Sequence, residues 1–150
     1  MTSETDPLGN TTTYTYDAVG NLLSSTTALG RTTSYTYDQR DRQTTETDPM
    51  GHVITFYYDD LGRLVGMDNK DGTHVAQTYD ANGNVLTVTD EEGYVVSYVY
   101  DLDGRMTEMT NARGHKTAYT YDAVGNITAV TDAMGGVTSS VYDANGNLVS

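Results

Sequence analysis

The dipeptide Tyr-Asp recurs along this 150-residue chain at a constant interval of 21 residues. The seven pairs begin at Tyr16, Tyr37, Tyr58, Tyr79, Tyr100, Tyr121 and Tyr142. A column of glycines, from Gly9 to Gly135, keeps the same interval. Self-similarity at a fixed period of roughly 20 to 50 residues is the signature of a repeat architecture. We therefore expect a tandem array in which each unit needs its neighbours for stability.

Each repeat contains two turns with the same chemistry. The first follows the tyrosine and has the form Asp-x-x-Gly; the second, ten residues later, is exemplified by Asp48-Pro49-Met50-Gly51. An aspartate that opens such a turn bonds the backbone two residues on, and a glycine in fourth place takes a left-handed conformation. This pattern predicts a three-residue hairpin loop, a type I turn closed by a glycine bulge. The first-turn residues are Asp17, Asp38, Asp59, Asp80, Asp101, Asp122 and Asp143, with Gly20, Gly62, Gly83, Gly104, Gly125 and Gly146; Asp41 interrupts the glycine column.

The segments between the turns predict strands of about six residues. One strand of each hairpin resembles residues 32–37, where Tyr35 and Tyr37 share a face, and the other resembles residues 84–89. No window has a sustained helical period. We expect an all-β fold, in which tandem 21-residue β-hairpins form about fourteen strands of one long, antiparallel, spiralling sheet, as in a shell or β-solenoid. Tyrosine rings of successive hairpins should stack into ladders.

Composition excludes several classes of protein. The net charge of −13 opposes binding to nucleic acid, because phosphate contacts need clustered lysine and arginine. No apolar stretch is long enough to span a membrane as a helix, and no signal peptide is visible. The chain has no cysteine, which leaves the redox compartment open.

The chain ends fall inside repeats. Met1 occupies the apolar strand column that also holds Leu22 and Leu64, and Ser150 stops in mid-strand. Neither end has a capping segment with a polar outer face. We expect residues 1–150 to be one continuous array of about seven repeats, a piece of a longer chain.

No residue pattern predicts catalysis or a cofactor. His52, His74 and His115 follow the second-turn glycines without a nucleophile at fixed spacing, so we interpret them as solvent-facing strand starts. Asp80, Asn82, Asp101 and Asp103 imitate the start of a calcium loop. They lack the distal glutamate of a complete loop, so turn formation is the favoured interpretation over calcium binding.

Two heptapeptides carry a family resemblance. The segments 58–64 (YDDLGRL) and 100–106 (YDLDGRM) resemble the pattern Y-D-x-x-G-R-L, and residues 16–22 and 121–127 show an asparagine variant. The whole chain resembles the tyrosine-aspartate (YD, or Rhs) repeat family of bacterial Rhs and wall-associated proteins, Tc toxin shells and teneurins. The resemblance implies an extracellular or cell-surface protein whose repeats form a spiralling sheet. Such a sheet wraps a toxin domain in a hollow cocoon or makes a surface attachment.

Three hypotheses for function remain. The favoured one is a structural segment of a shell, stalk or filament, and the alternative is an adhesion module that binds carbohydrate or a cell surface through exposed tyrosines. A hydrolase ranks last. The expected partners are further repeats or other copies of the chain, joined through sheet edges, with an encapsulated toxin domain or a surface glycan as further candidates.

Overall fold

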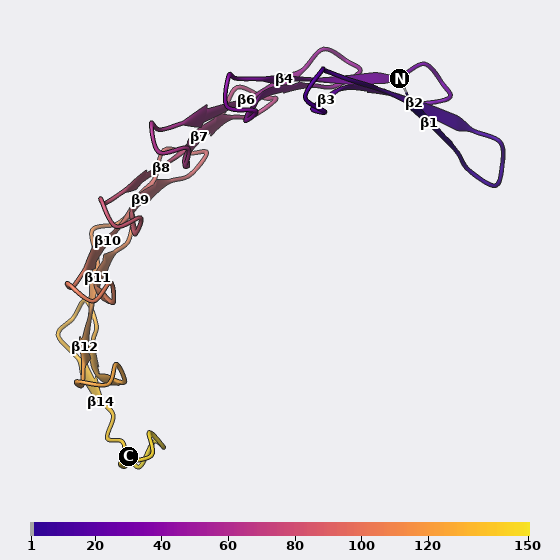
Figure 1. Ribbon diagram of the computed structural model, residues 1–150. Coiled ribbons are helices and arrows are strands. Elements are labelled where there is room, and N and C mark those ends of the chain that lie inside the picture. The colour runs from indigo at the N-terminus through magenta and orange to yellow at the C-terminus, as the bar shows by residue number, and fades with distance from the viewer. Residues whose placement is uncertain (1) are drawn as a thin grey trace. The chain divides into compact units, whose positions relative to one another are not determined.

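The computed structural model describes residues 2–150. Met1, which the sequence places at an apolar strand position, lies outside the described residues. Fourteen strands, β1 to β14, are hydrogen-bonded in sequence order in one open antiparallel sheet, and the described residues contain no helix (Figure 1). The predicted all-β fold of tandem hairpins is confirmed.

The contacts divide the chain into two compact units, residues 1–75 and 76–150. The first holds β1 (Thr2–Thr5), β2 (Thr11–Tyr16), β3 (Leu22–Thr26), β4 (Thr32–Tyr37), β5 (Gln43–Thr47), β6 (Val53–Tyr58) and β7 (Leu64–Asp68). Strand β8 (His74–Tyr79) begins at the end of the first unit. The second holds the rest of β8, β9 (Val85–Thr89), β10 (Val95–Tyr100), β11 (Met106–Thr110), β12 (Lys116–Tyr121), β13 (Ile127–Thr131) and β14 (Val137–Ser139).

None of the described residues belongs to a helix of the length and apolar character needed to cross a bilayer.

The turns have the predicted geometry. In the hairpin of β4 and β5, the backbone N–H of Asp38 donates to the carbonyl of Arg42 at 2.9 Å, and that of Asp41 donates to the carbonyl of Asp38 at 3.1 Å. The glycines in fourth place have φ between 73° at Gly30 and 104° at Gly20. Asp41, which replaces a glycine, keeps the left-handed conformation at φ 59°. The turn chemistry, not glycine alone, therefore sets the loop.

A second β-bulge, in addition to the predicted glycine bulge of the turn itself, follows the first six tyrosine turns. Thr36 pairs with Thr45 and Tyr37 with Gln43, so Thr44 is an extra residue in β5. The extra residues recur every 21 positions, at Leu23, Thr44, Val65, Leu86, Thr107 and Thr128. A bulge bends its strand and increases the local twist. The six bulges therefore add twist to the sheet once every 21 residues.

The sheet is a single layer with two unlike faces. On one face hydroxyl groups bond across the strands, as in the pairs Thr15–Ser24, Thr36–Thr45 and Thr78–Thr87, each at 2.6 Å. The other face carries most of the tyrosines and long apolar side chains. No described hydrophobic residue is buried, and Gly66 is the one described residue in the buried class. Stability therefore comes from contacts between neighbouring hairpins and not from a central core.

The seventh Tyr-Asp pair ends the sheet differently. Its turn forms, with Asp143 N–H donating to the carbonyl of Asn147 at 2.9 Å. The flanking residues Tyr142 and Leu148 make only an isolated bridge.

Candidate functional site

The first-turn aspartates hold their own loops. One oxygen of Asp38 accepts hydrogen bonds from the backbone N–H groups of Arg40 at 2.8 Å and Arg42 at 3.1 Å. In the second unit, Asp101 Oδ1 does the same for the N–H groups of Asp103 and Arg105 at 3.0 and 2.9 Å. The second carboxylate oxygen remains available to a side chain. It binds the residue that follows the turn.

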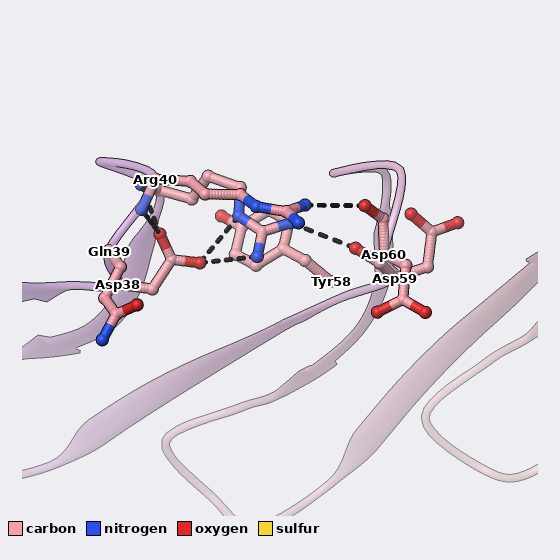
Figure 2. A pocket seen from close by; sticks show the side chains of 7 residues that line it. Asp38, Gln39, Arg40, Tyr58, Asp59 and Asp60 are labelled. Atoms are coloured by element: carbon pink, nitrogen blue, oxygen red, sulfur yellow. Dashed lines mark hydrogen bonds and ion pairs between the residues drawn. The ribbon is translucent and has the colours of Figure 1, made fainter.

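An arginine after the turn joins one repeat to the next. Arg42 Nε donates to Asp38 Oδ2 at 2.7 Å, and Arg42 Nη1 donates to the backbone carbonyl of Asp59, in the following tyrosine turn, at 3.1 Å. The guanidinium carbon lies 4.6 Å from the ring centroid of Tyr58. Figure 2 shows Asp38 on one side of this arrangement and Asp59 and Asp60 on the other. We call Asp38, Arg42, Tyr58 and Asp59 the Arg42 junction.

In three of the Tyr-Asp pairs the tyrosine reaches back to the preceding hairpin. Tyr58 Oη donates to the carbonyl of Gln43 at 2.9 Å, so the junction is closed from both sides. The same bond recurs from Tyr37 to Leu22 at 3.0 Å and from Tyr121 to Met106 at 2.6 Å. In the junctions the rings are covered by guanidinium groups, where the sequence had predicted other tyrosine rings.

The second unit repeats the arrangement. Arg105 Nε donates to Asp101 Oδ2 at 2.8 Å, Arg105 Nη1 donates to the carbonyl of Asp122 at 3.2 Å, and its guanidinium lies 5.0 Å from the ring of Tyr121. These residues form the Arg105 junction. Where asparagine follows the turn, the side chain is shorter. Asn126 Nδ2 bonds Asp122 of its own turn at 2.8 Å.

Sequence reasoning missed this role of arginine. The sequence feature that points to it is the position directly after the first turn. This position is arginine in three repeats (Arg42, Arg63 and Arg105) and asparagine in the other four. The contact with the next repeat depends on the hairpin register, which the column alone does not give.

These bonds keep the turn carboxylates ionised. The side-chain bond from Arg42 is the main cause that lowers the pKa of Asp38, and the backbone N–H of Arg105 is the main cause for Asp101. The side-chain bond from Asn126 lowers the pKa of Asp122. Each carboxylate is therefore matched to a donor at neutral pH.

A shallow hollow of about 320 Å³ lies over the Arg42 junction. It is lined by Asp38, Gln39, Arg40, Arg42, Tyr58, Asp59 and Asp60 (Figure 2). Arg40 Nη1 donates to the carbonyl of Asp60 at 2.6 Å, and Asp59 binds Arg63 Nε at 2.7 Å. The side chains of Asp38, Arg40, Arg42 and Asp59 are thus used in contacts within and between repeats, an arrangement that fastens hairpins together.

The calcium candidates fall in two successive tyrosine turns. Asp80 Oδ1 accepts from the N–H groups of Asn82 and Asn84 at 2.9 and 2.8 Å. Asp101 serves its own turn, and Asp103 pairs with Arg105 at 3.0 Å. Among residues 2–150, no group of three or more acidic, histidine or cysteine side chains is arranged to hold a metal ion. The structure thus gives three of the four candidate side chains, Asp80, Asp101 and Asp103, partners within their own turns.

The three histidines are exposed at or just before strand starts, as the sequence indicates. His52 Nδ1 lies 3.2 Å from Asp48 Oδ2, which also contacts Lys70 Nζ at 3.2 Å. His74 alone joins a cluster with an aromatic ring, and the cluster lies on the face with the hydroxyl rows.

The sequence profile of the RHS Repeat family matches residues 1–28, 16–49, 41–74, 79–117 and 121–150. The chain belongs to this family. The matches cover nearly the whole length, so the family's repeat accounts for both units. The resemblance inferred from the heptapeptides is confirmed.

Solved structures give the same fold for this RHS-repeat chain. It is similar to a crystal structure of a TcdB2-TccC3-Cdc42 complex, with a TM-score of 0.67 and 19% identity over 93% of the chain. A Photorhabdus luminescens Tc holotoxin pore containing a TccC3 variant gives a TM-score of 0.66 and 19% identity over 93% of the chain. In both cases the chain spans 9% of the length of the matched chain. No curated protein matches the sequence.

Proposed function

We propose that this chain is a wall segment of an extracellular shell, stalk or filament. The observation that carries the proposal is the arginine junction, in which one residue binds the turn of its own hairpin and the backbone of the next. A wall must transmit load from unit to unit. The Arg42 and Arg105 junctions do so with charge-assisted hydrogen bonds, one junction in each unit.

The single-layer architecture supports the same role. Each strand pairs with its sequence neighbours, and no described hydrophobic side chain is buried. Such a sheet extends in one direction by adding hairpins, with no need to enlarge a core. The structural likeness to chains of Tc toxin complexes agrees with a large assembly of which this segment forms a small part.

A closed shell has an inner side that can hold a second domain. By analogy with the family, we propose an encapsulated toxin domain as the partner of a closed shell. The alternative function, carbohydrate adhesion through the tyrosine column, stays a prediction. It has less support because Tyr37, Tyr58 and Tyr121 are engaged with the preceding hairpins through their hydroxyl groups.

Electron microscopy of the intact native protein tests the proposal. Closed, hollow particles of finite size support a shell, and continuous fibres with a regular repeat support a filament. Solid globular particles in which the repeats form no wall would contradict both. A variant with Arg42→Asn and Arg105→Asn provides the matched comparison, because asparagine occupies this column in other repeats. We expect it to fold but to give less uniform walls.

A further inference from the structure

Four residues of the first unit differ from the residues found at the equivalent positions of the other repeats. Tyr57 stands where the other repeats have threonine or valine, and His74 stands where they have threonine, valine or lysine. Asp68 stands where all six other repeats have threonine. Gly66 is the one glycine in its column. The other repeats therefore show which residues the fold usually has at these positions, and this one place in the sheet differs from them at all four.

The four residues meet on one face of the sheet. Tyr57 and Gly66 are cross-strand partners in β6 and β7. Tyr57 Oη donates to Asp68 Oδ2 at 2.5 Å, and His74 Nδ1 lies 2.5 Å from Asp68 Oδ1. The rings of Tyr57 and His74 have centroids 6.0 Å apart and are tilted by 57°. A Cβ at position 66 would lie 3.1 Å from His74 Cε1, so the missing side chain makes room for the imidazole.

The fold does not require this combination. Glycine weakens a strand interior, aspartate is disfavoured in strands, and an exposed ion pair adds little stability. The other repeats have threonine at the position equivalent to 68, and their hairpins form. An aromatic ring that covers a glycine in a sheet explains Tyr57 beside Gly66. It does not explain why Asp68 and His74 changed as well, and coordinated departures from local preference are typical of functional sites.

Elsewhere in the chain, an aspartate and a tyrosine together bind a guanidinium group. In the Arg42 junction a guanidinium group lies between the carboxylate of Asp38 and the ring of Tyr58. We propose that Tyr57, Asp68 and His74 form a binding site for the guanidinium group of an arginine side chain from a partner protein. The two oxygens of Asp68 accept one bond each from Tyr57 and His74, which leaves lone pairs for further donors. Among the described residues, no arginine is bonded to Asp68 as Arg42 is to Asp38.

Exposure and charge indicate that the arginine belongs to a protein. The side chains of Asp68 and His74 are 41% and 50% exposed, and Tyr57 is 42% exposed. A free small molecule needs a pocket that buries most of its surface, and this site is open. The arginine therefore supplies the specificity, and the partner's remaining surface adds to the affinity. The net charge of −13 attracts a basic partner over a longer range.

Nuclear magnetic resonance titration of the 150-residue chain tests the site. The probe is the blocked peptide acetyl-Gly-Arg-Gly-amide, followed through the backbone amides of Gly66, Asp68 and His74. The citrulline peptide of the same shape lacks the charge. We expect saturable shifts confined to the site, and about tenfold weaker binding of the citrulline peptide, because it loses the charge-assisted bond and the cation–π contact.

Two variants complete the experiment. Asp68→Thr introduces the residue that the other repeats have at this position, so the variant should fold. Its affinity for the arginine peptide should be about tenfold lower. Glu92→Gln removes one negative charge from the second unit and should leave the affinity unchanged. Equal binding of the citrulline peptide, an unchanged affinity in Asp68→Thr, or an equal loss in Glu92→Gln would each overturn the proposal.

Discussion

At the scale of single residues, a few positions determine how well each turn is made. Asp41 is the one residue other than glycine with a positive φ among residues 2–150. Glycine fills this column in the other repeats, and aspartate tolerates the left-handed conformation better than most side chains. Asp41 Oδ1 also accepts a bond from Asn21 Nδ2 at 2.9 Å. The conformational cost is therefore offset only in part.

Asp41→Gly should stabilise the chain. Glycine removes a left-handed cost of about 1 to 2 kcal/mol and loses one exposed side-chain bond, so we expect a net gain of about 1 kcal/mol. Urea unfolding followed by circular dichroism measures it. The matched variant is Gly62→Asp, where an added Cβ would lie 3.5 Å from Arg42 Nη1, an ordinary contact. It should lose a similar amount, and no change in either variant would contradict the strain argument.

Tyr58→Phe isolates the hydroxyl group of the Arg42 junction. The ring stays beneath the guanidinium, but the bond to the carbonyl of Gln43 is lost. We expect a loss of about 0.5 to 1.5 kcal/mol in the free energy of unfolding. Tyr94→Phe is the control, because Tyr94 is 60% exposed in a turn. Equal effects in the two variants would show that the junction hydroxyl adds nothing specific.

At the scale of the hairpin, the sequence predicted the turns, with their glycine bulges, and the strand ends, but not the second bulge in the strand after the turn. Asp-x-x-Gly determines its loop locally, so the turn of residues 38–42 was predictable from five residues. Thr44 looks like an ordinary strand residue. It becomes an extra residue because Tyr37 pairs with Gln43 beside the turn, whereas Thr36 pairs with Thr45 beyond it. That pairing involves two strands and cannot be seen in the sequence of one.

The second turn after the first Tyr-Asp pair, at residues 27–31, is the weakest by this chemistry. Thr27 stands where the other repeats have aspartate or asparagine, and its hydroxyl accepts only a long bond of 3.3 Å from the N–H of Arg31. Thr27→Asp should raise the free energy of unfolding by about 0.5 to 1 kcal/mol, since a carboxylate accepts two backbone bonds. The reciprocal variant Asp90→Thr should lower it, because Asp90 accepts from Glu92 and Tyr94 at 3.1 and 2.8 Å. Shifts of the same sign in both would refute this explanation.

At the scale of the whole molecule, repeated turn carboxylates replace a hydrophobic core as the shared source of stability. The period and the strand number followed from the sequence because every unit repeats the same local rules. The arginine junctions and the cluster at Tyr57 could not be predicted from the sequence, because each joins residues whose distance depends on the register of strand pairing. Asp68 was detectable only as a departure from a threonine column.

Acid should weaken the array in a defined direction. The pKa values of Asp38, Asp101 and Asp122 are lowered in the folded chain from an ordinary value of 3.8. The unfolded chain therefore binds protons first, and the stability from these groups is fully present above about pH 5 and is lost as pH falls through the folded values. The urea concentration at the midpoint of unfolding should be constant from pH 7 to about pH 5, and it should decrease once the pH is lower than about 4. Level midpoints to pH 2.5 would contradict this.

Self-association is the second expectation at this scale. Strands β1 and β14 are the outer strands of the described sheet, and an outer strand presents backbone groups to further strands. Sedimentation velocity should show larger species as the concentration rises. Ser3→Lys places a charge on β1, where Ser3 pairs with Thr13, and should reduce the association. A single monomer boundary at every concentration would rule out edge pairing.

The single layer formed by residues 2–150 has a consequence for how such a chain changes in length. A hairpin in this part of the chain contacts the hairpins before and after it, so a gain or loss of 21 residues would re-form the strand pairing and would change only the side-chain contacts at the new boundary. The number of repeats can then change without enlarging or opening a core, and the size of what the repeats build follows from how many units the chain holds.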